Sequence, residues 1–242
     1  GLVRTVDNFG TTGESPSHSG LLDYLAVQFV QQGWSVKKLI REIALSKTYR
    51  LSSMRGEQRE DPENRLLAHM NHRRMDAEAI RDTMLSVSGQ LNFEMGGATF
   101  PVTLKTDVDF RFKEPRRSVY VPVFRSSLPE LFEVFDFANT SMVTGRRNLS
   151  TVAPQALFMM NHPFVRAQAQ LSAERLLGDS HPKEGDRIDH AYLRILGRHA
   201  TAAEIAISQK FLKSVATEKN QVEAWTQMVH SLFSTIDFRY IR

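Results

Sequence analysis

The sequence contains no cysteine, and this absence removes several kinds of chemistry at once. Disulfides, thiolate nucleophiles, thiolate zinc sites, iron–sulfur ligation and covalent C-x-x-C-H haem attachment all require that residue. Long apolar runs are missing too, because none approaches the roughly 18 residues that a membrane span needs. No signal peptide is visible, and the chain begins with Gly1 rather than Met. We therefore expect the C-terminal part of something longer, and the residues themselves leave the compartment open.

Catalytic and nucleotide-binding signatures are also missing. The sequence has no G-x-S-x-G nucleophile motif, no H-E-x-x-H metal motif, no G-x-G-x-x-G turn and no Walker A loop. Lys and Arg number 31 against 27 Asp and Glu, and the two signs are interleaved along the chain. A nucleic-acid binder usually shows a basic stripe with a recognisable motif. We expect no nucleic-acid partner and no cofactor held by this chain.

The composition is that of an ordinary globular protein. Hydrophobic residues make up 41% and charged residues 24% of the 242 positions. A chain of this length can bury a substantial core without disulfides. We find no internal repeat, no low-complexity segment and no convincing linker, so a single domain over residues 1–242 is predicted.

The spacing of apolar residues predicts helices along most of the chain. The first helix ends at Gly33 and Ser35 caps the second, so these two form a helical hairpin, with Trp34 expected to pack on Leu39. The second helix is expected to bury a stripe of Leu39, Ile40, Ile43 and Ala44. The predicted helices cover residues 21–30, 35–44, 61–89 with a bend or fresh start at 71–76, 128–136, 154–160, 163–177, 186–196, 201–215 and 221–233.

One segment in the centre has a strand pattern. Residues 118–124 are rich in valine and aromatic residues, although Pro122 favours an edge position. Residues 91–114 contain two adjacent glycines and predict a long loop or an irregular hairpin. The fold class is therefore mainly α: an irregular multi-helix domain with one small β element, a strand or hairpin, in the centre.

The stretch from Arg116 to Phe164 concentrates arginines and carboxylates, and the preceding helix adds more. Arg74 and Glu78 have the spacing of a helical ion pair, which leaves Arg81 and Asp82 to reach elsewhere. The candidate ligand-binding residues are Arg74, Glu78, Arg81, Asp82, Arg117, Arg125, Asp136 and Arg147.

These residues support two interpretations. Arginine forks bind carboxylate, sulfate or phosphate groups in two-pronged contacts, so the cluster could bind an anionic ligand. Alternatively the same groups form an internal ion-pair network that ties a loop-rich centre to its helices, and we favour this second interpretation.

Metal binding has weaker support. His69, His72 and Asp76 would lie on one helix face at spacings that suit a metal ion, but a solvated face explains them better. The group of Asp186, Asp189 and His190 is weaker still, because Asp186 is well placed as a helix cap. We predict no metal site.

Four ordered motifs resemble a known family. DNFGTTGESPSHSGLLDYLA with GWSVKKLIREIALSKTYR, NRLLAHMNHRRMDAEAIRDTMLSVSG, RRSVYVPVFR and RRNLSTVAPQALFMMNHPFV are similar to the planctomycete PSD-type domain of unknown function, domain of unknown function 1553. The resemblance covers nearly the whole chain. It implies a C-terminal domain of large extracytoplasmic proteins that carry cytochrome c-like domains, so any haem would belong to those other domains.

Two functional hypotheses follow. The first is an accessory or interaction domain that docks on upstream domains of the same polypeptide or binds an anionic or carbohydrate ligand through the central Arg-rich site. The alternative is a hydrolase of saccharides or of sulfate or phosphate esters, with Glu78, Asp82 or Asp136 as acid or base.

Overall fold

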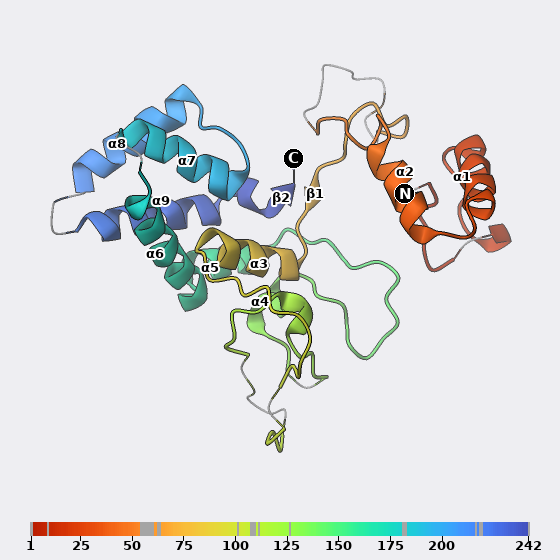
Figure 1. Cartoon of the computed structure of the whole chain (residues 1–242), viewed down its shortest axis with the longest axis horizontal. Helices are drawn as coiled ribbons and strands as arrows, with labels where there is room; N and C mark the ends of the chain where they lie inside the picture. Colours follow the sequence, from red (N-terminus) through yellow and green to blue (C-terminus); the bar gives the residue numbers. More distant parts are fainter. Residues whose placement is uncertain are drawn as a thin grey trace. The chain divides into compact units, whose positions relative to one another are not determined.

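The computed structural model describes residues 2–8, 10–53, 61, 64–100, 102–106, 110, 112–125, 127–180, 183–215, 217 and 220–241. Its contacts divide the chain into two compact units (Figure 1). The N-terminal unit comprises residues 1–73, 144–146 and 242, and the C-terminal unit comprises residues 74–143 and 147–241. The single-domain prediction stays a prediction, because this division does not show whether the units fold together.

The N-terminal unit contains the predicted helical hairpin. A short 3₁₀ turn, η1 (Gly10–Thr12), precedes α1 (Ser19–Gln31) and α2 (Val36–Leu45). The chain reverses at Gly33 and Trp34, which both have positive φ angles. Ser35 accepts a hydrogen bond from the Lys38 amide and so caps α2, as expected.

The expected buried stripe of α2 is wrong. Ile40 is 59% exposed and Ile43 39%, and none of the described hydrophobic residues of this unit is fully buried. Trp34 contacts the edge of Phe29, with ring centroids 5.4 Å apart, and remains largely exposed. Two helices cover only the face that they share, so the other apolar faces of this hairpin stay open within its own unit.

The C-terminal unit holds the remaining helices. In chain order they are α3 (Ala77–Val87), η2 (Ser118–Tyr120), α4 (Glu130–Val134), α5 (Ala153–Asn161), α6 (Pro163–Gly178), α7 (Glu184–Leu196), α8 (Ala202–Val215), α9 (Gln221–Ser234) and η3 (Asp237–Arg239). A two-stranded sheet pairs β1 (Arg73–Arg74) with β2 (Tyr240–Ile241). The prediction of a mainly α fold with one small β element is confirmed.

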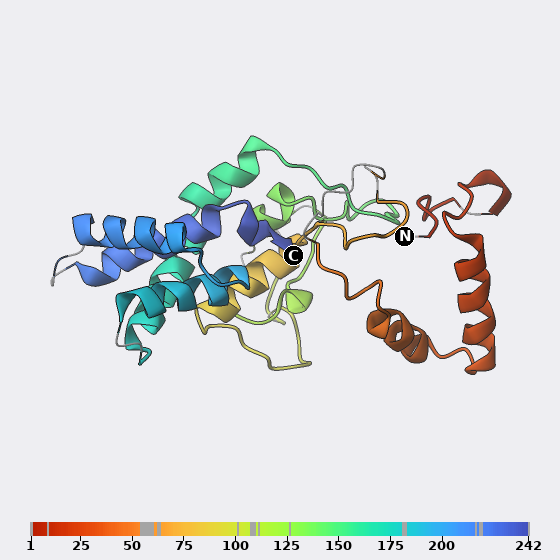
Figure 2. The same ribbon diagram turned by 90° about the horizontal axis from the view of Figure 1, so that it is seen from above.

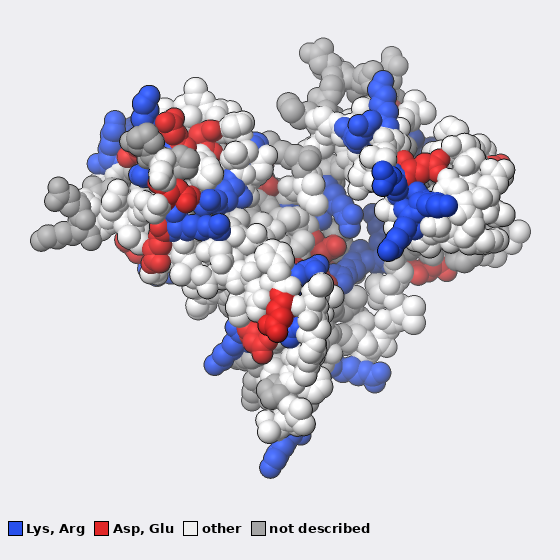
Figure 3. All heavy atoms as spheres, in the orientation of Figure 1, with Lys and Arg blue, Asp and Glu red and all other residues white. Residues whose placement is uncertain are grey.

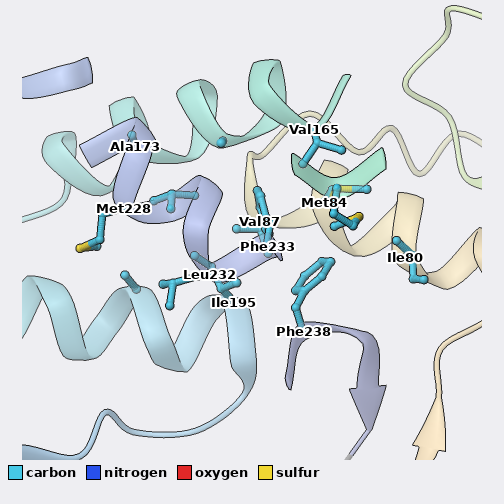
Figure 4. Packing of buried hydrophobic residues seen from close by; sticks show 14 of the residues in the cluster. Ile80, Met84, Val87, Val165, Ala173, Ile195, Met228, Leu232, Phe233 and Phe238 are labelled. Carbon is cyan, nitrogen blue, oxygen red and sulfur yellow. The ribbon is translucent and has the colours of Figure 1, made fainter. Parts of the chain in front are cut away.

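Helices α6 and α9 form the centre of the C-terminal unit and lie against each other in both views (Figures 1 and 2). Their shared core is completed by α3, α5 and α7. Figure 4 shows Met84 of α3, Val165 of α6 and Phe233 of α9 meeting in this core, with Phe238 closing it from below. All four are almost fully buried.

The helix predicted over 61–89 is correct only in its second half. Helix α3 starts after Asp76, which agrees with the fresh start expected at 71–76, and Ala77, Ile80, Met84 and Val87 are buried as predicted. The predicted start at Pro62 lies outside the described residues. Asn64 and Leu67 have positive φ angles, which a right-handed helix does not allow. The Asn64 amide also binds the His69 carbonyl, so its side chain stabilises a loop instead.

The predicted strand at 118–124 is wrong. Residues Ser118–Tyr120 form the 3₁₀ turn η2, and the described neighbourhood has only an isolated bridge between Asn92 and Arg116. The Asp82 carboxylate accepts the Ser118 N–H at 2.8 and 3.0 Å. Arg81 donates to the Arg116 carbonyl at 2.8 Å. Side chains of α3 therefore take the backbone groups that a neighbouring strand would have used.

The five helices from α5 to α9 are confirmed to within three residues at each end. Gly197 ends α7 in the left-handed conformation (φ 68°). Thr201 and Glu204 form the predicted capping box at the start of α8, where each side chain bonds the backbone N–H of the other. In the described part of the chain, no helix is long and apolar enough to cross a membrane.

Candidate functional site

A cleft of about 800 Å³ opens in the C-terminal unit. It lies where α4, the start of α6 and the loop before η2 meet over the C-terminal half of α3. Its lining residues are Arg81, Leu85, Gln90, Phe110, Phe112, Lys113, Glu114, Pro115, Val121, Ser127, Leu128, Pro129, Glu130, Leu131, Phe132, Glu133, Phe158, His162, Phe164, Gln168 and Leu171. This volume is in the range of small-molecule sites.

Phenyl rings supply much of the cleft surface. Phe132 and Phe158 are buried, while Phe112 and Phe164 are half-buried and keep part of each ring open. Phe132 is fixed because α4 turns its apolar side onto the core. The cleft is therefore lined by two buried phenyl rings and by two that remain partly accessible.

His162 links α5 to α6 and carries its ring over Phe158, with centroids 4.2 Å apart. Its Nδ1 accepts the Phe164 N–H at 3.1 Å and caps α6. The neutral ring therefore carries its proton on Nε2, which lies 3.4 Å from a Glu130 carboxylate oxygen. Glu130 and the Nε2 of His162 present an oriented acceptor and donor at the cleft.

Gln168 of α6 is buried, and its orientation is set by Ser88. The Ser88 hydroxyl donates to Gln168 Oε1 at 2.7 Å. The other end of the side chain, the amide Nε2, donates no hydrogen bond to the described residues and is not fully covered. Gln168 thus offers the cleft two N–H donors in a fixed direction.

Arg81 lines the cleft, but its N–H groups donate to groups of the chain itself. Its guanidinium donates to the carbonyls of Glu114 and Arg116, both at 2.8 Å. The guanidinium carbon also lies over the Phe112 ring, 5.5 Å from the ring centre. Asp82 is 3.5 Å away. Burial lowers the pKa of Arg81, although the Asp82 charge opposes this. Arg81 therefore shapes the cleft wall and adds positive potential rather than a free fork.

Arg74 does not pair with Glu78, contrary to the sequence expectation. The i, i+4 spacing applies only within a helix, and α3 begins after Arg74. Arg74 binds Asp136 at 2.8 Å and donates to the carbonyls of Phe135 and Ser150. Burial alone would raise the pKa of Asp136, but hydrogen bonds from Ser150 and Arg74 outweigh it and lower the pKa.

Glu78 instead binds Arg147 through two hydrogen bonds of 2.7 and 2.8 Å. Burial opposes ionisation of Glu78, but the Arg147 contacts outweigh it and lower the pKa of the carboxyl. Hydrogen bonding to Glu78 correspondingly raises the pKa of Arg147. Arg147 also lies over the Phe137 ring, 4.5 Å from its centre.

Six of the eight candidate residues thus lie in three ion pairs: Arg74 with Asp136, Glu78 with Arg147, and Arg81 with Asp82. Arg117 and Arg125 are exposed, and their side chains bind none of the described residues. These contacts support the internal-network interpretation for the six. Ligand binding by the eight stays a prediction.

No group of three or more His, Asp or Glu side chains in the described part of the chain is arranged to hold a metal ion. His69 and His72 lie outside any helix, and His69 Nδ1 is 3.1 Å from its neighbour's carbonyl. Asp189 binds His199 at 2.8 Å, and His190 lies 3.6 Å from Asp179. On the face shown in Figure 3, basic and acidic side chains are intermixed.

Sequence reasoning missed the cleft. Nothing in the local pattern marks Gln168, because its role depends on Ser88, 80 positions away. His162 does have a signal, since it directly precedes the proline that opens α6 and so occupies the cap position.

Comparison with known families supports the resemblance read from the motifs. The sequence matches the family model PSD1, described as "Protein of unknown function (DUF1553)", over residues 1–212. No curated protein and no solved structure matches the chain.

Proposed function

This chain belongs to the PSD1 family of unknown function (DUF1553), and we propose that it is a non-catalytic accessory domain that binds a saccharide in the aromatic cleft beside Arg81. The single observation that carries the proposal is the composition of that cleft. It places half-buried phenyl rings next to an amide and an imidazole whose directions are already set.

The chemistry of the cleft suits sugars. A sugar ring has an apolar face that packs on an aromatic ring, and hydroxyl groups around its edge that need directed donors and acceptors. Phe112 and Phe164 provide the faces. Gln168 Nε2, His162 Nε2 and the Glu130 carboxylate provide the hydrogen-bonding groups. Because the Gln168 amide and the His162 ring are held before the ligand arrives, little ordering entropy is lost at these two groups on binding.

The positive charges of Arg81 and Lys113 favour acidic sugars as ligands too. Arg81 is held in place by two carbonyls, and Lys113 is an exposed lining residue of the same cleft. The carboxylates of Glu114, Glu130 and Glu133 also line the cleft and would repel an anion close to them. A uronate or sulfated unit is expected to place its charge toward Arg81.

The hydrolase alternative is less well supported. Its proposed acids, Glu78, Asp82 and Asp136, do not line the cleft, and each is engaged by Arg or Ser groups. The lowered pKa of Glu78 and of Asp136 keeps these two carboxyls ionised near neutral pH. An ionised carboxylate cannot donate the proton that glycoside cleavage requires.

Two wider features of the proposal rest on the motif resemblance alone. We propose that the domain acts outside the cytoplasm, and that it works beside upstream cytochrome c-like domains of one larger polypeptide. Cell fractionation of the source organism, followed by immunodetection of this chain, tests both: recovery in the cytoplasm, or as a protein without those domains, would reject them.

The binding proposal is tested with a panel of neutral, uronate and sulfated oligosaccharides, measured by thermal shift and by calorimetry. A selective ligand is expected to lose at least tenfold in affinity with Phe112→Ala or Gln168→Met. The control is Phe93→Ala, because Phe93 is 69% exposed and does not line the cleft. No binding across the panel by a folded sample rejects the proposal. Release of shorter sugars by the chain alone would favour the hydrolase.

A further inference from the structure

Arg239 is a guanidinium that the fold covers without supplying an opposite charge. It ends η3, directly after the core residue Phe238, and is only 7% exposed. None of the described residues accepts a hydrogen bond from its side chain or forms an ion pair with it. Buried arginines are almost always paired, because an isolated charge loses its hydration on burial.

The open end of this side chain faces solvent. The Nε atom of Arg239 is fully covered and has no acceptor. The two terminal Nη atoms also have no acceptor among the described residues, but they are not fully covered. A group from outside can therefore reach the terminal fork, although not the Nε–H.

A second guanidinium, that of Arg74, repels the positive charge of Arg239 and so increases the need for a negative partner. Burial and the positive charge of Arg74 lower the pKa of Arg239, while Tyr240 acts in the opposite direction. Arg74 is itself 4% exposed, and its terminal donors are taken by Asp136 and two backbone carbonyls. Asp136 is the carboxylate of this pair and also binds Ser150. Arg74 thus has a carboxylate partner, whereas the positive charge of Arg239 has none among the described residues.

We propose that the Nη fork of Arg239 binds a carboxylate group that comes from outside the described chain. A carboxylate is planar and carries one negative charge, so it accepts two parallel N–H donors and cancels the single excess charge. A phosphate or sulfate dianion would need further donors, and the terminal nitrogens of Arg74 already bind Asp136 and two backbone carbonyls. The carboxylate belongs either to a small molecule or to an acidic side chain of another polypeptide.

The first experiment measures thermal stability of the intact chain in acetate against chloride, at fixed ionic strength and neutral pH, in a buffer without carboxylates. Acetate at about a hundred times its Kd is expected to raise the Tm by roughly 5 to 10 °C in a saturable way. Arg239→Met removes this effect, whereas Arg117→Met retains it, because Arg117 loses the same charge from an exposed position. A saturable acetate effect that survives in Arg239→Met overturns the proposal.

A second measurement observes the site directly and does not depend on a variant that removes the charge. In ¹⁵N-edited spectra of arginine side chains, one Nη signal is expected to shift on acetate titration, and Arg239→Lys identifies it by its loss. If no arginine signal shifts, or if sulfate or phosphate shifts this signal at lower concentration than acetate, the carboxylate assignment is wrong.

Stability without ligand gives an independent check. In chloride, Arg239→Met is expected to be at least as stable as the natural chain, because it removes an unpaired buried cation. A marked drop in Tm would show that Arg239 is already paired, and would overturn the proposal.

To identify the source of the carboxylate, the binding of glucuronate and of a short acidic peptide is then compared with that of acetate. Tighter binding of glucuronate than acetate indicates a small-molecule ligand, and tighter binding of the peptide indicates another polypeptide. The site is distinct from the saccharide cleft, since Arg239 does not line it. Gln168→Met therefore affects only the cleft and Arg239→Met only the carboxylate site, so either proposal can fail without the other.

Discussion

Asp136 carries one half of the buried pair with Arg74 and has a left-handed backbone conformation (φ 58°). Asn tolerates that conformation, so Asp136→Asn removes the charge with little backbone strain. The variant leaves Arg74 buried without an opposite charge, which is expected to cost about 3 kcal/mol of unfolding free energy. Urea denaturation measures this loss.

The control for that prediction is Arg125→Met, at an exposed arginine with no described side-chain partner. It is expected to change the unfolding free energy by less than about 0.5 kcal/mol. The double variant Arg74→Met/Asp136→Asn should lose less than the sum of its single variants, since it removes both charges. Equal stability of Asp136→Asn and Arg125→Met would contradict the buried-pair assignment.

The second prediction concerns stability in acid, which depends on the Glu204 carboxyl. Hydrogen bonds from Arg198, reinforced by Thr201, lower the pKa of Glu204 from 4.5 to about 2, against the opposing effect of burial. A carboxyl with a lowered pKa in the folded state stabilises the protein above its unfolded pKa and loses this contribution as the pH falls. Unfolding free energy should therefore decline between about pH 4.5 and pH 2.

In Glu204→Gln this part of the acid decline should become shallower, as measured by urea unfolding at a series of pH values. Arg198→Met should have a similar effect, because Arg198 holds the carboxylate through bonds of 2.7 and 2.9 Å. Identical acid profiles of Glu204→Gln and the natural chain would show that the pair does not contribute.

At the scale of elements, the C-terminal end of α7 depends on a single glycine. Gly197 ends α7 at φ 68°, and no atom lies within 4 Å of the position that a Cβ would take. Gly197→Ala therefore tests backbone conformation alone, and is expected to cost about 1 to 2 kcal/mol. Thermal unfolding measures it.

The matched control is Gly178→Ala at the last residue of α6, where a Cβ also meets no atom within 4 Å. Because the backbone there is helical, alanine is expected to be neutral or to stabilise by up to about 1 kcal/mol. A cost as large as that of Gly197→Ala would mean that lost flexibility, rather than the left-handed conformation, explains both.

For the whole molecule, all buried hydrophobic residues of the described chain lie in the C-terminal unit, from Ala77 to Phe238. A protein of residues 74–241 should therefore unfold cooperatively, with a Tm close to that of the full chain. Far-UV circular dichroism during heating measures this. A broad transition would show that residues 1–73 are needed for the core to form.

Local signals explain which parts of the fold were predictable. The helices from α5 onward follow their apolar periodicity, and Gly197 and the Thr201–Glu204 box mark ends within a few residues of the signal. The helix at 61–76 and the strand at 118–124 failed for a different reason. In both, a side chain binds a backbone group that the expected element would have used. Asn64 binds the His69 carbonyl in the first, and Asp82 accepts the Ser118 N–H in the second.

The candidate site shows the same division. Composition and spacing indicated that arginines and carboxylates would pair, but the pairing of Arg74 with Asp136 joins residues 62 positions apart. Neither that pair nor the open fork of Arg239 has a local pattern. The cleft likewise depends on Gln168 being turned by Ser88.

The sequence by itself therefore determined the mainly α class, most helix ends and the family, because these depend on periodicity, caps and motifs within a few turns of chain. The tertiary structure alone decided which charges are paired, which guanidinium is left without a partner and where a ligand-sized cleft opens. Those features arise from contacts between distant segments, and packing of α3, α4, α6 and η3 brings their side chains together.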